Sequence, residues 1–383
     1  MRKRILRISA AAFFLASLLL PYHTAAAEEI SVSAEAAVVA ELESGRILFS
    51  KNGEKRMKAA STVKILTALV VLDRLDPALS VRIRPEWTGI EGSSMYLRAG
   101  DVCTVEDLLT GMLLVSGNDA ATALACLTAG DQEAFAELMN EKAASLGMKD
   151  SRFSDPCGLS ADDHWVTAAD MARLGCAAMK NERLRKLVSS RTAQAAGKTL
   201  QNHNKLLWRY EGAVGIKTGY TKAAGRTLVS CAERNGVSFV CVTLNAPDDW
   251  TDHTALLDWA FSCFERIAAP MGEMTVPVIS GETPAVALIP KETVSLLVPR
   301  SIHAVWRAVI PRFVYAPVTA GEEVGCLRCR DGEGNVLAEV PLVLASDVAV
   351  KDGEALDLWE KLRWAWSYAC RHSASRPQNV FYW

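Results

Sequence analysis

Three short motifs follow one another along the chain and supply the groups needed to break an amide bond through an acyl-serine. They are Ser61-Thr62-Val63-Lys64, Ser116-Gly117-Asn118 and Lys217-Thr218-Gly219. Together they provide a nucleophilic hydroxyl, an amine that activates it, a second hydroxyl that relays a proton, and a cationic edge for a carboxylate. Each motif alone is weak, but all three in this order predict a serine hydrolase.

The first motif places a serine and a lysine on one face of a helix. Residues 63–75 are apolar nearly all round, which indicates a buried helix with Ser61 at its start. Lys64 lies three residues on, within reach of the hydroxyl. To act as a base it must be neutral, so we expect burial and a nearby cation such as Lys217 to lower its pKa. Taken alone, the motif is also compatible with an ordinary N-cap serine.

The second motif reads as a loop between two helices that faces the nucleophile. Ser116 can pass a proton from Lys64 to the leaving amine, and Asn118 can hold both Lys64 and a substrate amide. A helix-terminating turn is the alternative explanation, because serine, glycine and asparagine are common turn residues.

The third motif lies on a predicted strand. Lys217 brings charge to the site, and Thr218 can hydrogen-bond a carboxylate. Gly219 is expected to leave room for a peptide that adds to the sheet as an extra strand. The backbone N–H groups of Ser61 and Tyr220 are the candidates for an oxyanion hole.

The order of predicted elements indicates an α+β catalytic domain. Strand patterns at 36–50 and 213–244 flank a helical middle between 105 and 179, and a helix is expected at 256–266. This order predicts an antiparallel sheet built from both ends of the domain, with a helical subdomain inserted and the active site at the seam.

Four segments are predicted along the chain. Residues 1–27, with four basic residues, an apolar run and Ala25-Ala26-Ala27, read as a signal peptide. Residues 28–269 form the catalytic domain and 270–350 a small β-rich domain. Residues 351–383 read as an amphipathic helix and a tail.

Composition narrows the function classes. The chain has 383 residues, half of them apolar, and a net charge of −2, which argues against disorder and against nucleic-acid binding. The ten cysteines are scattered, so buried thiols are the simplest interpretation, and Cys326-x-x-Cys329 lacks the second pair of a zinc site. We predict neither a metal nor a cofactor.

The motifs and several longer segments resemble those of the serine-type D-Ala-D-Ala carboxypeptidases, the low-molecular-mass penicillin-binding proteins. The resemblance covers nearly the whole mature chain and includes segments 153–159, 202–207, 215–221 and 256–261. It implies a DD-peptidase/β-lactamase-like fold in which Ser61 forms the acyl-enzyme, Lys64 accepts its proton, Ser116 assists and Lys217 binds substrate. It also implies removal of the terminal D-alanine from peptidoglycan pentapeptide stems and inhibition by β-lactam antibiotics.

Two departures from the family pattern stand out. Asp155 and Cys157 occupy positions where relatives often have asparagine and histidine, so a structural hydrogen bond is expected to differ. The family also often uses an arginine after the last strand to bind the substrate carboxylate. Here the segment 248–253 offers no arginine, and His253 is the candidate for that role.

The end of the chain is similar to the membrane-resting helix of the family. Leu358, Leu362 and Trp366 fall on one predicted face, while Lys361 and Arg363 suit anionic headgroups. Together with the signal peptide, this predicts an extracytoplasmic protein at the outer face of the cytoplasmic membrane. A helix packed on its own protein is the alternative.

Two other functions are compatible with parts of the pattern. A β-lactamase shares the nucleophile and the Lys-Thr-Gly strand, but no Glu-x-x-Leu-Asn segment supplies a water-activating base. A non-catalytic wall-binding sensor on the same fold would not need Ser61, Lys64 and Lys217. The sequence leaves open transpeptidation, the oligomeric state, the redox state of the thiols and a vegetative or sporulation role.

Overall fold

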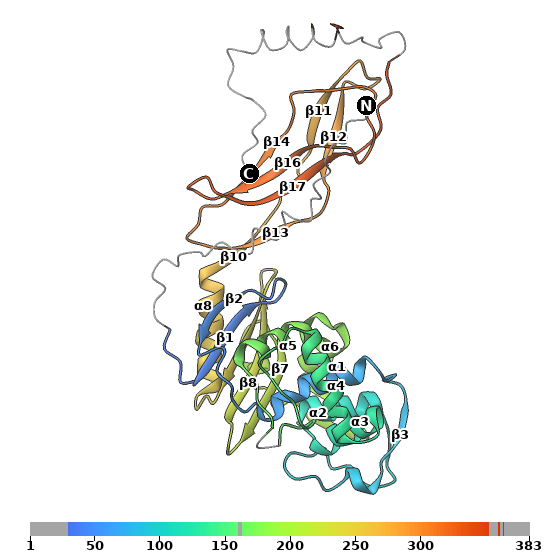
Figure 1. Ribbon diagram of the computed structural model, residues 1–383, viewed down its shortest axis with the longest axis vertical. Helices are drawn as coiled ribbons and strands as arrows, with labels where there is room; N and C mark the ends of the chain where they lie inside the picture. Colours follow the sequence, from blue (N-terminus) through green and yellow to red (C-terminus); the bar gives the residue numbers. More distant parts are fainter. Residues whose placement is uncertain (1–29, 160–162, 352–358, 361–362, 364–383) are drawn as a thin grey trace, which may run out of the picture. The chain divides into compact units, whose positions relative to one another are not determined.

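The computed structural model describes residues 30–159, 163–351, 359–360 and 363 (Figure 1). It divides into two compact units, and the boundary along the chain falls between Ser262 and Cys263. The predicted signal peptide lies outside the described residues, as does most of the predicted C-terminal helix. The boundary proposed from composition, between residues 269 and 270, stays a prediction.

A five-stranded antiparallel sheet organises the first unit and confirms the predicted α+β class. Its strands come from both ends of the unit, in the order β2-β1-β9-β8-β7. They are β1 (Ala36–Glu41), β2 (Ile47–Lys51), β7 (Ala213–Thr221), β8 (Gly225–Arg234) and β9 (Val237–Leu244). Asn235 and Gly236 join β8 to β9 with positive φ angles of 51° and 72°, as a two-residue hairpin turn requires. The sheet leaves β7, which carries the third motif, as an edge strand.

The predicted helical middle is present between β2 and β7. Its helices are α1 (Lys64–Leu72), α2 (Val105–Leu114), α3 (Asn118–Ala129), α4 (Gln132–Ser145), α5 (Ala168–Lys180), α6 (Glu182–Ser189) and the short α7 (Leu206–Arg209). Local signals fix several starts: Thr104 and Asp107 form a capping box on α2, and the Thr167 side chain caps α5. Short elements complete this part of the unit: η3 (Ala60–Val63), η4 (Pro85–Trp87), β3 (Ser80–Arg82), β4 (Val102–Thr104), β5 (Thr192–Ala195) and β6 (Lys198–Gln201).

Helices cover both faces of the sheet. In Figure 1, α5 and α6 lie on the face turned to the helical subdomain, and α8 (Asp249–Cys263) lies on the other. Edge-to-face ring contacts attach α8 to the strands, with centroids 4.9 Å apart for Phe239–Phe261 and 5.8 Å for Phe49–Trp259. The sheet is therefore buried on both sides and forms a rigid base for its edge strand.

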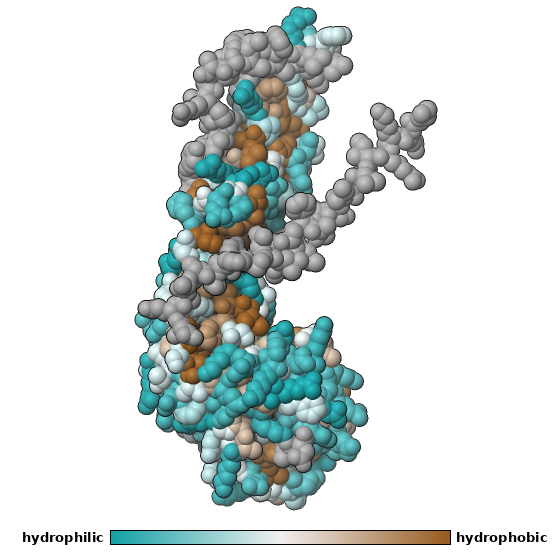
Figure 2. Space-filling model, turned by 60° about the vertical axis from the view of Figure 1, so that its left-hand side comes forward, coloured by the Kyte–Doolittle hydropathy of each residue, from teal (hydrophilic) through white to brown (hydrophobic). Residues whose placement is uncertain are grey.

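The second unit is built from β-strands. Six of them form one sheet in the order β14-β16-β17-β12-β11-β15, and β10 pairs with β13. Their bounds are β10 (Phe264–Ala268), β11 (Met274–Ile279), β12 (Ala285–Pro290), β13 (Ser295–Pro299), β14 (Val305–Val309), β15 (Val314–Tyr315), β16 (Glu323–Arg330) and β17 (Val336–Leu344). On the face drawn in Figure 2, hydrophilic residues cover most of the first unit, while hydrophobic patches are interspersed over the second.

The helix predicted at 256–266 was wrong at both ends. It begins earlier, at Asp249, and ends at Cys263. Residues 264–268 instead pair with β13, which lies some thirty residues further along the chain. A local apolar pattern cannot show such a partner, and the long-range pairing overrides the helical periodicity.

Candidate active site

The nucleophile and the amine of the first motif are in direct contact. Ser61 lies in the 3₁₀ turn η3, immediately before α1 begins at Lys64. The Nζ atom of Lys64 is 2.9 Å from Ser61 Oγ, and it also contacts Ser116 Oγ at 3.3 Å and Asn118 Oδ1 at 2.5 Å. The amine thus joins the first and second motifs.

Burial controls the charge of this amine. Lys64 has no exposed surface, and its burial lowers the pKa from 10.5 to about 8, against the opposing effects of Cys157, Asp155 and Asp119. Burial therefore lowers this pKa as expected, whereas the expected contribution of Lys217 is not among the causes of the shift. Burial likewise holds the pKa of Lys217 well below its usual range, and the charge of Lys64 adds to this shift.

The second motif forms the tight connection between α2 and α3. Ser116 takes a left-handed conformation with φ of 62°, which turns the chain directly into the first residue of α3, Asn118. Asn118 Nδ2 donates to Glu91 O at 2.5 Å and its backbone N–H to Ser93 O at 2.7 Å. Asn118 therefore holds the Lys64 amine through its side chain, and the loop that carries Ser93 through its side chain and backbone.

The third motif brings a second buried amine close enough to Lys64 for their charges to interact. Lys217 is 1% exposed, and its Nζ donates to Thr218 O at 2.9 Å. Lys217 also lowers the pKa of His203, after the larger effect of burial. Tyr220, in contrast, is 65% exposed at the rim of the site.

Gly219 brings the edge strand close to the turn that carries the nucleophile. A Cβ at this position would lie 3.0 Å from the backbone nitrogen of Ser61, 3.1 Å from that of Thr62 and 2.4 Å from Thr227 Oγ1. The missing side chain therefore makes room for the turn η3; that it also leaves room for a peptide substrate stays a prediction. Thr227 reinforces this contact, because its hydroxyl donates to Ala59 O at 2.9 Å.

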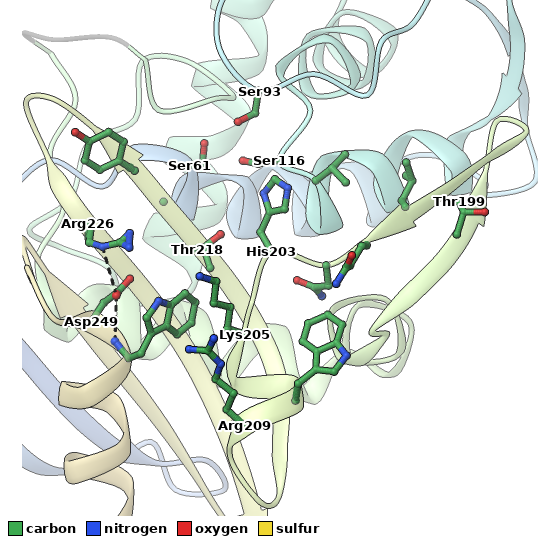
Figure 3. Close-up of a pocket in the computed structure, with 18 residues that line it drawn as sticks. Ser61, Ser93, Ser116, Thr199, His203, Lys205, Arg209, Thr218, Arg226 and Asp249 are labelled. Carbon is green, nitrogen blue, oxygen red and sulfur yellow. Dashed lines mark hydrogen bonds and ion pairs between the residues drawn. The ribbon is translucent and has the colours of Figure 1, made fainter.

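These groups face one pocket of about 880 Å³ (Figure 3). Ser61, Ser116 and Thr218 line it, and Figure 3 shows the Ser61 side chain between the nucleophile turn and Ser93. The walls also include residues to which the sequence assigned no role: Ser93, His203, Lys205, Trp208, Arg209, Arg226, Asp249 and Trp250. The sequence connects segment 202–207 with the site only through the family resemblance. No local pattern shows that α7 packs against β7.

The first departure from the family pattern, Asp155 with Cys157, lies in a turn close to Lys64. Asp155 Oδ1 accepts hydrogen bonds from the backbone N–H groups of Cys157, Gly158 and Leu159, and so orders the turn behind Lys64. Burial raises the pKa of the Cys157 thiol to about 11, so the thiol remains neutral.

His253 does not line the pocket, so its candidate role as a carboxylate ligand was wrong. It is fully buried, with Nδ1 2.6 Å from Ser230 Oγ and Nε2 2.9 Å from Thr243 Oγ1. Burial lowers its pKa to about 3, so the ring is neutral as well as inaccessible. Two other residues of α8, Asp249 and Trp250, line the pocket, and Asp249 pairs with Arg226.

The remaining expectations concern metals, thiols and membrane spans. Within the described residues, no group of three or more potential metal ligands occurs. Each of the nine cysteines in the same part of the chain is free, and most are buried. The described helices include none that is long and apolar enough to span a bilayer.

A serine activated by a buried lysine and lying next to an edge strand that carries Lys-Thr-Gly defines a serine-type peptidase. The model of the D-alanyl-D-alanine carboxypeptidase family matches residues 23–248, and that of the penicillin-binding protein 5 C-terminal domain matches residues 270–350. The chain belongs to the D-alanyl-D-alanine carboxypeptidase family.

Individual relatives agree with this assignment over most of the chain. The carboxypeptidase DacF of Bacillus subtilis is 31% identical, covering 84% of this chain and 87% of the relative. DacC of Escherichia coli is 32% identical, covering 84% and 86%. The crystal structure of penicillin-binding protein 5 from Haemophilus influenzae superimposes with a TM-score of 0.66 at 27% identity, over 84% of this chain and 99% of that one. The β-lactamase and sensor alternatives are not favoured.

Proposed function

We propose that the chain removes the terminal D-alanine from peptidoglycan pentapeptide stems, with Ser61 as the nucleophile and Lys64 as the base. The proposal is carried by the contact of the fully buried Lys64 amine with Ser61 Oγ at 2.9 Å and with Ser116 Oγ at 3.3 Å. An amine with a pKa near 8 can accept a proton at neutral pH and return it.

The reaction proceeds in two transfers. Ser61 Oγ attacks the carbonyl carbon of the penultimate D-alanine while its proton passes to Lys64, and the oxyanion is stabilised by the backbone N–H groups of Ser61 and Tyr220. Ser116 relays the proton from Lys64 to the leaving nitrogen, the C–N bond breaks and D-alanine departs. Water then attacks the ester, and the proton that it loses returns to Ser61 Oγ.

Asn118, Lys217, Thr218 and Gly219 complete the site by positioning. Asn118 orients Lys64 and contacts the substrate amide, whereas Lys217 and Thr218 supply positive charge and a hydroxyl near the substrate carboxylate. Gly219 permits η3 to reach the sheet edge. A β-lactam would acylate the same serine and remain attached.

Penicillin labelling tests the nucleophile directly. The wild-type protein should gain the mass of one penicillin on the peptide that contains Ser61 and should release D-alanine from an acyl-Lys-D-Ala-D-Ala peptide. The variant S61A should do neither. We expect S116A to acylate about 100-fold or more slowly, since it keeps the nucleophile and loses the relay. Label on another residue, or full activity in S61A, would refute the assignment.

We also infer that the protein is exported and rests on the outer face of the cytoplasmic membrane. The support is the basic and apolar N-terminal segment followed by small residues, and the aromatic and basic pattern of residues 356–371. Deleting residues 352–383 should move the mature protein from the membrane fraction to the soluble one. A truncated form that still sediments with membranes would contradict the inference.

A further inference from the structure

The end of the active-site pocket that lies beyond Thr218 carries an excess of positive charge. Arg226 from β8, with Lys205 and Arg209 from around α7, lines this end, and Asp249 is its single acidic residue in the described part of the wall. We call these three cations and Asp249 the cationic end of the pocket. In Figure 3 the side chains of Lys205 and Arg209 extend toward Thr218 from below, and Arg226 extends toward it from the side.

Asp249 connects two of the cations. Its Oδ1 lies 3.5 Å from Nε of Arg226, and burial raises its pKa whereas Arg226 and Lys205 both act to lower it. The Asp249 side chain is 5% exposed and that of Arg226 is 44% exposed. The acid is thus embedded in the wall, while the guanidinium reaches into the groove.

The geometry of this ion pair leaves Arg226 available for a ligand. Asp249 contacts Nε, so the two terminal nitrogens of the guanidinium are not used by it, and they have no hydrogen-bond acceptor among the described residues. A guanidinium with free terminal nitrogens matches a carboxylate in a bidentate manner. Lys205 and Arg209 have no ion-pair partner in the described chain either, so the pocket end has a net positive charge.

We propose that Arg226 binds the carboxylate of the C-terminal D-alanine of the substrate, with Thr218 beside it and with Asp249 as the residue that positions the guanidinium. The proposal rests on the proposed function, because it assigns a binding role within that reaction. It places the carboxylate-binding arginine inside β8 instead of in the segment after the last strand, where 248–253 contains none. Lys205 contributes through its charge alone.

A peptide acid and its C-terminal amide distinguish this role from a structural one. The wild-type protein should cleave acyl-Lys-D-Ala-D-Ala with a higher kcat/KM than the same peptide ending in a carboxamide. In R226Q this preference should fall about 10- to 100-fold, through loss of activity on the acid and not on the amide. R226K should recover part of the preference, and D249N should reduce it while acting mainly on KM.

The chain offers a closely matched control. Arg173 on α5 also pairs with a buried aspartate, Asp170, at 2.6 Å, and its side chain is 42% exposed, but it does not line the pocket. R173Q should keep the wild-type preference. K205Q should lower the preference less than R226Q does; a complete loss in K205Q with none in R226Q would overturn the assignment.

Binding without turnover separates this inference from the proposed reaction. In an S61A background, calorimetry should show tighter binding of the peptide acid than of the amide, and this difference should vanish when R226Q is added. A difference that survives R226Q refutes the role of Arg226, whatever the turnover. Failure of the wild type to release D-alanine would instead refute the proposed function.

Discussion

A Cβ at Gly219 would approach the backbone nitrogen of Ser61 to 3.0 Å, so the edge strand and the nucleophile turn are in van der Waals contact without any side chain between them. This contact fixes the distance between β7 and η3. It therefore sets the position of the Ser61 hydroxyl relative to the backbone of the third motif, where the oxyanion of the reaction would form.

The first prediction follows from that contact. In G219A the new methyl group would lie 2.4 Å from Thr227 Oγ1, which donates to Ala59 O, and 3.0 Å from Ser61 N. The Thr227 side chain must therefore shift, and η3 is pushed away from β7. We expect the acylation rate with penicillin to fall at least about 10-fold, because a small displacement of a nucleophile is costly. The unfolding free energy should fall as well, by the about 1–3 kcal/mol that overpacking typically costs, and the melting temperature should fall with it.

Gly332 provides the control for this substitution. A Cβ there would meet only His303 Cβ, at 4.0 Å, and the residue lies in the second unit. G332A should keep the wild-type acylation rate. Unchanged acylation in G219A would show that the contact does not position Ser61.

The second prediction concerns the pH dependence of acylation. Burial lowers the pKa of Lys64 to about 8, and only the neutral amine can accept the Ser61 proton. The acylation rate constant should therefore rise with pH and level off above about 8. At pH 6 it should be about 100-fold below the plateau, since two pH units separate it from the pKa. Stopped-flow measurement with a fluorescent penicillin gives this profile.

A variant with a permanent charge tests the cause of the profile. K64R keeps a cation near Ser61 but cannot release its proton in this range, so it should remain inactive at every pH. An acylation rate that is flat between pH 6 and 9 in the wild type would exclude Lys64 as the base.

The third prediction concerns the loop that carries Ser93. Asp119 is 1% exposed and accepts hydrogen bonds from Met95 N and Leu97 N, both at 3.0 Å, and from Ser94 Oγ at 2.6 Å. In D119A these buried donors lose their acceptor, which should lower the unfolding free energy by about 2–3 kcal/mol. Acylation should slow too, because this loop forms a wall of the pocket. Urea unfolding and penicillin labelling measure the two effects.

Asp131 supplies a control in the same subdomain. It caps α4 by accepting from Ala134 N at 2.8 Å, and it lies away from the pocket. D131A should cost about 1 kcal/mol and leave acylation unchanged. An equal loss of acylation in both variants would mean that general destabilisation, and not the loop, is responsible.

The sequence predicted those parts of the site whose chemistry demands particular residue types. Ser61, Lys64, Ser116 and Asn118 could be grouped because an acyl-transfer site needs a nucleophile, a base and a relay, and the structure brings all four together. The antiparallel sheet was also predictable, since alternation and the turn after β8 are local signals.

Other features depend on partners that are remote in the chain. In the sequence, Arg226 is not distinguishable from other polar residues of a strand. Its role depends on Asp249, which the fold of α8 places next to it. His253 lies in a polar stretch, yet its helix turns it into the interior against Ser230 and Thr243. Strand β10 required a pairing with β13 that no local pattern could reveal.

The last prediction uses His253 as a pH-sensitive element of stability. Its pKa is about 3 in the folded protein, below the ordinary value of 6.5, so the unfolded chain binds the proton more readily between these values. The stability due to the neutral ring is thus complete above pH 6.5 and is lost as pH falls toward 3. Acidification from pH 7 to 4.5 should therefore lower the unfolding free energy by up to about 2.5 kcal/mol through this residue. Urea titrations at the two pH values measure the change.

Asparagine at this position cannot take up the proton. H253N should be less stable than the wild type at pH 7, because Ser230 and Thr243 lose their ring partner, but its stability should change less on acidification. H303N, at an exposed site in the second unit, should retain the wild-type dependence. If H253N and the wild type lose the same free energy between pH 7 and 4.5, the buried ring is not the source of the acid sensitivity.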